Sequence, residues 1–384
     1  MPRVLFLGGS HQQLAPILYA KAMGYHTIVC DYTPENPAIG LADEWHSAST
    51  TDIEAILKVS RDSKIDGIVA YASDPAAYTA ALVAEKLGLP GNPPASVEIL
   101  SKKDLYRNFL YKNGFNTPGV LFGDSPNLEY PVVIKPTDSS GSRGITVLRN
   151  QVGFTDAVKR ANVFSRSGDI IIEKYIERDG YQIAGDGFLV DGKLVRACFA
   201  NEHFDPDGGI VPIGESFPYI GNMETQSKVR SEIQRLIDAL GMKNGALNFD
   251  IVISNDKIYL MEIGPRNGGC LIPEVIKYST GVDMISATVE CAIGNRIIFP
   301  KSERRGFYSS YMIHSQYPGK FKSLDTDDSI NIVEANLWVN AGDEIKSYEN
   351  SSCTLGTMIL KFDNQLEMLE RMNRMRDYVR AVVE

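Results

Sequence analysis

The sequence has 384 residues, of which 43% are hydrophobic and 23% charged, and its formal net charge is −9. These proportions are close to globular averages and argue against a disordered or membrane-embedded chain. The negative charge, without a concentrated Lys/Arg face, argues against general binding to nucleic acid. The 5 cysteines are scattered and form no CxxC motif, which disfavours a zinc site or a disulfide framework and favours a cytoplasmic location.

Residues 1–100 are predicted to form a doubly wound domain. Strand and helix patterns alternate there, which is typical of a parallel sheet that helices cover on both faces. The predicted strands are residues 4–9, 26–32 and 65–71, and helices are predicted up to Met23, over 53–62 and over 76–88.

The rest of the chain is predicted to be α+β. A helix is expected around Lys103–Asn113, and the strands that follow are joined by short turns with few intervening helices, which indicates antiparallel sheets. These strands are residues 130–136, 144–150, 170–176, 187–200 and 248–263. Residues 301–384 are expected to form a small domain with strands at 310–314 and 358–362 and a closing helix over Gln365–Val383.

Asp250 and Glu262 are the strongest local signal of chemistry. They lie on two predicted strands joined by a turn at Ser254–Lys257. An odd-numbered loop, such as residues 255–257, would place them opposite each other on one face. Like charges in that position are destabilising, and Mg²⁺ would compensate them. The alternative is an even-numbered loop that turns one carboxylate to solvent.

Three other segments have the composition of phosphate or nucleotide contacts. Arg266 lies in a glycine-rich loop where a guanidinium would steady a transferring phosphoryl group, with a surface arginine as the alternative. Lys135 precedes the loop Thr137–Gly144, whose small residues let backbone N–H groups approach phosphate. This loop joins two strands and lacks GxxxxGK[ST], so it is not a Walker A loop. The groups of Glu173–Ile176 could bond an adenine edge, and an edge strand is the alternative.

In this order, the segments resemble the ATP-grasp superfamily over nearly the whole chain. The shared features are the doubly wound start, a lysine helix with G-x-x-x-P (residues 102–118), a V-x-K-P strand with a flap, an E-x-Y-I hinge, and acidic strands ending in E-x-x-P-R. The resemblance implies an N-terminal domain over 1–100, an ATP-grasp domain over 101–300 with a mobile flap at about 117–176, and a C-terminal domain over 301–384.

The resemblance also implies residue roles. Catalytic roles fall to Arg266, Lys135 and Arg143, and the Mg²⁺ ligands, with Mn²⁺ as an alternative metal, would be Asp250, Glu262 and Asn267. The ATP-binding set would be Lys103, Lys135, Ser139, Ser140, Gly141, Ser142, Gly144, Glu173, Lys174, Tyr175, Ile176 and Gln182. Substrate contacts would come from His203, Glu215, Gly268 and Gly269. Within residues 201–218, Glu202, His203, Asp205 and Glu215 are polar enough to contact an amine or polar head group, and solvated loop positions are the alternative.

Two positions depart from the family pattern. Many members have an asparagine two residues after the second acid as a further metal ligand, and this sequence has Gly264 there. The usual acidic ribose partner is replaced by Gln182, with Asp186 as a nearby candidate. The first loop resembles a dinucleotide site because Asp31 follows the second strand, but Ser10 replaces the second glycine of GxGxxG. A nicotinamide-dependent oxidoreductase is therefore the weaker alternative.

The expected reaction uses ATP and Mg²⁺ to activate a small carboxylate as an acyl phosphate, with release of ADP, and an amine then displaces phosphate. The expected partners are small-molecule carboxylates and amines, with neither nucleic acid nor membrane, and a homodimer is an open possibility. Alternatives inside the superfamily are a purine-pathway enzyme, a bicarbonate-using carboxylase and a carbamoyl-phosphate-forming enzyme. A catalytically impaired ATP-binding scaffold is the alternative of another class.

Overall fold

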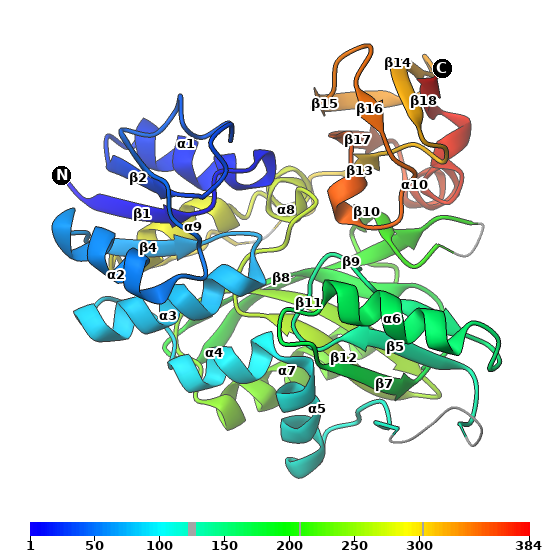
Figure 1. Ribbon diagram of the computed structural model, residues 1–384, viewed down its shortest axis with the longest axis horizontal. Helices are drawn as coiled ribbons and strands as arrows, with labels where there is room; N and C mark the ends of the chain where they lie inside the picture. Colours follow the sequence, from blue (N-terminus) through cyan, green and yellow to red (C-terminus); the bar gives the residue numbers. More distant parts are fainter. Residues whose placement is uncertain (122–127, 207–208, 302) are drawn as a thin grey trace.

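The computed structural model describes residues 1–121, 128–206, 209–301 and 303–384. A parallel sheet with helices begins the chain, and one larger and two smaller antiparallel sheets follow it among the described residues (Figure 1). The predicted fold class, α/β followed by α+β, is confirmed.

A four-stranded parallel sheet in the order β3-β2-β1-β4 forms the N-terminal region. Its strands are β1 (Arg3–Leu7), β2 (His26–Cys30), β3 (Glu44–His46) and β4 (Gly67–Ala70), and its helices are η1 (His11–Gln13), α1 (Leu14–Ala22), α2 (Ile53–Asp62), α3 (Asp74–Leu87) and α9 (Met284–Ala292). Alternate side chains of β1 and β2 face α2 and α3 on one side and α1 and α9 on the other. Because α9 comes from late in the sequence, residues 1–100 do not complete this region alone.

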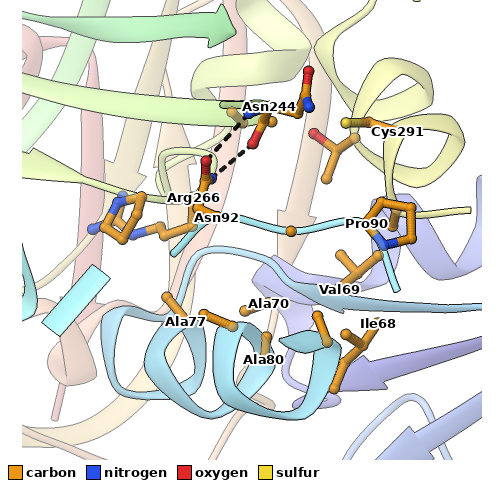
Figure 2. Close-up of a pocket in the computed structure, with 18 of the residues that line it drawn as sticks. Ile68, Val69, Ala70, Ala77, Ala80, Pro90, Asn92, Asn244, Arg266 and Cys291 are labelled. Carbon is orange, nitrogen blue, oxygen red and sulfur yellow. Dashed lines mark hydrogen bonds between the residues drawn. The ribbon is translucent and has the colours of Figure 1, made fainter. Parts of the chain in front are cut away.

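The Asn92 side chain hydrogen-bonds the linker after α3 to the turn that leads into the central sheet. Its Nδ2 donates to the carbonyl of Asn244 at 2.7 Å, and its Oδ1 accepts from the backbone N–H groups of Lys243 and Asn244 at 2.8 and 3.2 Å. Figure 2 shows these residues at the wall of a cavity of about 100 Å³, which is also lined by alanines of α3 and by Arg266. Two helices follow the linker, α4 (Pro94–Ser101) and α5 (Lys103–Lys112).

The central sheet has eight antiparallel strands in the order β12-β11-β8-β9-β10-β13-β17-β15. They are β8 (Gln182–Val190), β9 (Lys193–Phe204), β10 (Pro212–Phe217), β11 (Gly245–Ser254), β12 (Lys257–Gly264), β13 (Phe307–Ile313), β15 (Asn331–Leu337) and β17 (Gly356–Phe362). The helices α7 (Met223–Leu240) and α8 (Ile272–Thr280) pack on opposite faces. β13, β15 and β17 extend the sheet, so the boundary predicted at residue 300 runs through continuous structure.

The flap is a three-stranded sheet in the order β6-β5-β7 backed by one helix. Its elements are β5 (Val132–Pro136), β6 (Thr146–Leu148), α6 (Phe154–Phe164) and β7 (Ile170–Lys174). Within the predicted flap, residues 122–127 lie outside the described residues. The prediction of few helices among these strands was wrong, because α6 and α7 both interrupt them. α7 begins at the Asn222 side chain, which accepts from Thr225 N–H at 2.8 Å, and ends at Gly241 in a left-handed conformation.

The closing helix predicted over Gln365–Val383 was wrong in its second half. The C-terminal elements are β14 (Gly319–Thr326), β16 (Glu344–Ile345), η3 (Ser351–Cys353), α10 (Gln365–Met372), η4 (Met375–Asp377) and β18 (Val379–Val383). The β-branched valines at the end of the chain pair with β14, where they fit a pleated strand better than a helix.

Among the residues described, no helix is both long and apolar enough to cross a membrane. All 5 cysteines are unpaired.

Candidate active site

A cavity of about 940 Å³ lies where four parts of the chain meet. Its floor is the face of the central sheet at β8 to β12, and the flap loop covers it. The floor and flap residues are Gln182, Ala184, Glu202, Glu215, Asn248, Asp250, Glu262, Ser139, Ser140, Gly141, Ser142 and Arg143. Loops of the N-terminal region and the C-terminal segment close its sides with Ser10, His11, Gln12, Asp74, Trp338, Tyr348 and Ser351.

Asp250 and Glu262 face each other across β11 and β12 at the floor of this cavity. The loop between them has two residues, Asn255 and Asp256, both with positive φ, so the predicted odd-numbered loop was wrong. A two-residue loop alone would turn the carboxylates to opposite faces. A β-bulge at Met261 adds one residue to β12 and returns Glu262 to the same face of the sheet as Asp250.

The two carboxylates interact strongly. Burial and the nearby charge of Glu262 raise the pKa of Asp250 to about 7. Lys103 lies beside them, with its Nζ 3.3 Å from Glu262 Oε2. Facing carboxylate oxygens are suitable ligands for a hard divalent cation, which would relieve their repulsion. The described residues contain no cluster of three or more His, Cys, Asp or Glu that could hold a metal, so phosphate and water would have to complete the coordination.

Arg266 is held over the floor by the N-terminal region. Its Nε and Nη2 donate to the two oxygens of Asp74 at 2.8 and 2.7 Å, and its Nη1 donates to Asn248 Oδ1 at 2.8 Å. An ideal Cβ at Gly264 would lie 3.0 Å from both Arg266 Cζ and Asp74 Oδ1. A side chain at position 264 would therefore crowd the Asp74–Arg266 pair, which explains the absence of an asparagine there. Asn248 lies directly opposite Gly264 on β11.

Asn267 is not placed as the predicted metal ligand. Its side chain is buried outside the cavity lining, its Oδ1 accepts from Thr288 Oγ1 at 2.7 Å, and its Nδ2 donates to Asp186 at 3.4 Å. Asp186 also accepts from Gly268 N–H at 2.9 Å, so this buried carboxylate anchors the loop and is not available for ribose. Burial raises the pKa of Asp186 to about 6. Sequence reasoning missed the anchor, because its partners lie about 80 residues away in the chain.

Glu173 is buried between two cations. Lys135 Nζ and Arg107 Nε each lie 2.6 Å from its oxygens. Burial alone would raise the pKa of Glu173, but the two cations lower it to about 2. Burial lowers the pKa of Lys135 to about 8. The Glu173 side chain is therefore held by two cations outside the cavity lining, and Arg107, which sequence reasoning missed, is one of its partners.

The remaining hinge residues lie outside the cavity lining. The backbone N–H groups of Lys174 and Tyr175 donate to the carbonyls of Gly119 and Pro131 at 2.9 and 3.0 Å. Neither these residues nor Ile176 are among those that line the cavity, whereas Gln182 is.

The flap loop rests on the C-terminal segment. The backbone N–H of Ser351 donates to the Gly141 carbonyl at 3.1 Å, and a Cβ at Gly141, whose φ is +67°, would collide with Ser351 Oγ. Lys103 Nζ donates to the Ser139 carbonyl at 2.8 Å. Gly144 does not line the cavity, and a Cβ at this position would lie 2.9 Å from the Phe164 Cβ. The flap is therefore closed over the floor.

Residues 100–270 match the family described as ATP-grasp domain. This match covers the flap, the facing carboxylates and Arg266. These residues of the chain are an ATP-grasp domain.

Known proteins agree with this assignment. The large chain of carbamoyl phosphate synthase from Corynebacterium glutamicum is 24% identical over 345 residues, which cover 84% of this chain and 29% of that protein. The chain thus spans less than a third of that relative's length. Two solved structures have a similar fold: phosphoribosylglycinamide synthetase from Anaerococcus prevotii (TM-score 0.78, 22% identity, 100% of both chains) and L-amino acid ligase from Bacillus licheniformis (TM-score 0.83, 19% identity, 100% of this chain and 99% of that one). The predicted resemblance to ATP-grasp proteins is confirmed for residues 100–270.

The ATP-grasp floor also carries the predicted substrate segment. Glu202, His203 and Glu215 are all buried, so the alternative of solvated loop positions was wrong for them; Asp207 and Gly208 lie outside the described residues. Glu202 and Glu215 line the cavity. His203 faces away from it, and its Nε2 and Nδ1 lie 2.8 and 3.1 Å from Ser216 Oγ and Asn373 Oδ1. His203 is therefore not placed for substrate.

The predicted glycines of the second acidic loop differ in position. Gly269 lines the ATP-grasp cavity, whereas Gly268 is turned toward Asp186. At the opposite wall, Gln13 fills the space under Gly8, where a Cβ would overlap its side-chain amide. The first loop thus contributes polar side chains, including Gln12, to the wall of the cavity.

Proposed function

We propose that this ATP-grasp chain uses ATP and Mg²⁺ to convert a substrate carboxylate into an acyl phosphate, with release of ADP, and joins the acyl group to an amine. The observation that carries the proposal is the facing pair Asp250 and Glu262 beside Lys103 and Arg266 in one cavity. Positioning and charge neutralisation supply most of the catalysis in phosphoryl transfer.

Each side chain has a role that its contacts support. Mg²⁺ held by Asp250 and Glu262 would supply positive charge to phosphate oxygens. Lys103 bonds both the floor and the flap, at Glu262 and Ser139, so it would hold phosphate where the two meet. Arg266 is fixed by a bidentate pair and directed to the floor, where it would stabilise charge on the transferring group.

The flap would protect the activated intermediate. Ser139, Ser140 and Arg143 cover the cavity, and the contact of Gly141 with Ser351 joins the flap to the C-terminal segment. An acyl phosphate reacts with water, so a closed cover favours transfer to the amine. Lys135 is also predicted to contact an ATP phosphate. Its Nζ forms an ion pair with Glu173, so it would have to give up part of that ion pair to bind ATP.

The amine acceptor is supported by likeness over the whole chain to the L-amino acid ligase fold. A carbamoyl-phosphate-type reaction on bicarbonate is the second candidate, favoured by the sequence relationship to carbamoyl phosphate synthase. The scaffold alternative loses its main support, because Gly264 is explained by the Asp74–Arg266 pair.

The test is incubation with ATP, MgCl₂ and separate pools of carboxylates and amines, with ADP, phosphate and hydroxylamine-trapped hydroxamate as readouts. Asp250→Asn and Glu262→Gln are expected to abolish ADP and hydroxamate formation and to weaken Mn²⁺ binding measured by electron paramagnetic resonance. Asp256→Asn is the matched control, because it lies in the exposed turn of the same hairpin. AMP with pyrophosphate as products, or ADP formation unchanged in both variants, contradicts the proposal.

A further inference from the structure

A second pair of acids faces the cavity from the neighbouring strands. Glu202 on β9 and Glu215 on β10 are direct partners in the antiparallel ladder. Their exposed fractions are 4% and 3%, and both line the cavity. Like charges directly opposite across a ladder repel each other, so this pair costs stability unless something compensates it.

The protein leaves the pair incompletely satisfied. Glu215 Oε2 accepts from Ser310 Oγ at 2.7 Å. Glu202 Oε2 is buried and has no hydrogen-bond partner among the described residues. Burial raises the pKa of Glu215 to about 8, and burial with the charge of Asp250 raises that of Glu202 well above its usual value. The nearby cation Arg178 lies over the ring of Phe204, at 4.6 Å. The pair therefore has hydrogen-bond acceptor positions that the described residues do not use, and both side chains line the cavity.

The floor places this pair at a fixed separation from the proposed metal ligands. Asp250 on β11 is opposite Ala184 on β8, and Ala184 is opposite Ala200 on β9, two residues before Glu202. Adjacent strands lie about 4.8 Å apart, so β9 lies about 10 Å from β11. Alanines leave the floor between them open. One substrate could therefore reach the second pair while another occupies the first.

We propose that Glu202 and Glu215 form the subsite that binds the amino group of the amine substrate as an ammonium and accepts its proton before the nitrogen attacks. This inference rests on the proposed function. An ammonium group brings a positive charge and three N–H donors, which match two carboxylates with free acceptor positions. A second divalent cation at this pair is the alternative, and the Mn²⁺ measurement described below distinguishes it from an ammonium group. Gln182, opposite Glu202 in the ladder, adds a neutral polar contact at the cavity wall.

The test uses Glu202→Gln and Glu215→Gln, which keep the side-chain shape and remove the charge. The probes are L-alanine, L-phenylalanine, L-glutamate and L-lysine, each compared with the same acid lacking its α-amino group. Calorimetric binding and the KM for the amine are measured, and hydroxamate formation with hydroxylamine reports carboxylate activation without the amine. We expect at least one amino acid to bind in preference to its amine-free analogue. Each substitution should raise Kd and KM about tenfold or more, with hydroxamate formation retained and Asp256→Asn unchanged.

The outcomes separate this inference from the proposed function. Hydroxamate formation with an unchanged KM for the amine in both variants overturns the subsite and leaves the reaction standing. Absence of ADP and hydroxamate, with amino-acid binding that both variants lose, overturns the reaction and leaves the subsite standing. The subsite is also overturned if none of the four amino acids binds, or if either variant loses a bound Mn²⁺ in the resonance measurement. A thermal unfolding scan of each variant confirms folding, and removal of an unpaired buried charge should leave the midpoint equal or higher.

Discussion

Gly264→Asn restores the residue that many ATP-grasp proteins have, and we expect it to impair this one. The new Cβ would lie 3.0 Å from Arg266 Cζ and from Asp74 Oδ1. Inserting atoms into a filled site costs about 1–3 kcal/mol, and separating a buried ion pair costs about 3–5 kcal/mol when one partner is left alone. We therefore expect the free energy of unfolding to fall by at least about 1 kcal/mol. ADP formation should also fall, because a displaced Arg266 guanidinium stabilises the transferring group less, and each 1.4 kcal/mol of lost transition-state stabilisation slows the reaction about tenfold.

Chemical denaturation and ADP release measure the two effects, and Gly264→Ala is the matched control. Alanine adds the same Cβ without the amide and should show a smaller loss of both quantities. The opposite view is that Gly264 marks a missing metal ligand. In that case Gly264→Asn would tighten Mn²⁺ binding and increase ADP formation, and this result would refute the steric explanation.

Three further substitutions test other contacts. Glu173→Gln should lower the free energy of unfolding by about 3–5 kcal/mol, since it leaves two buried cations without their counterion. The folded pKa of Glu173 is about 2 and its usual value 4.5, so its stabilisation is complete above pH 4.5 and is lost as the pH falls toward 2. Between pH 4.5 and 2, the free energy of unfolding should change less with pH for Glu173→Gln than for wild type. The exposed control Glu54→Gln should show the same pH dependence as wild type. Asn267→Ala should keep the Mn²⁺ affinity but destabilise the loop that Asp186 anchors; a loss of Mn²⁺ would restore Asn267 as a ligand. Gly141→Ala should raise the KM for ATP several-fold by disturbing flap closure, and an unchanged KM would mean that this flap contact is not used.

The facing acids illustrate what sequence reasoning reached and where it stopped. The alternation of side chains along the two strands predicted that Asp250 and Glu262 lie on one face. The loop length assumed for that prediction was wrong. The correct register depends on the bulge at Met261, whose carbonyl accepts from Arg107 Nη1 at 2.8 Å. Arg107 lies on α5, 154 positions earlier, and local periodicity carries no information about such a contact.

The same limit applies to the residues that were misassigned. Asn267 follows the second acid closely enough to resemble a ligand, but its orientation is decided by Thr288 on α9 and by Asp186 on β8. Glu202 was expected only as one of four polar side chains in residues 201–218 that could contact substrate, and its pairing with Glu215 depends on the register of β9 and β10. The ordered motifs were sufficient for the family, whereas side-chain directions required the packed sheet.

The partners of the buried acids separate those that support the fold from those that are available to ligands. Asp186 accepts four hydrogen bonds from the loop and from Asn248, and Glu173 has two cations. By contrast, Asp250 faces another acid, Glu262, and Glu202 Oε2 has no hydrogen-bond partner in the described part of the chain. Facing like charges and a buried acid without partners both cost folding free energy, and Asp250 and Glu202 lie on the cavity face. The same repulsion that weakens the free protein would strengthen binding of positive charge there, since a ligand that binds only the folded state stabilises it by mass action.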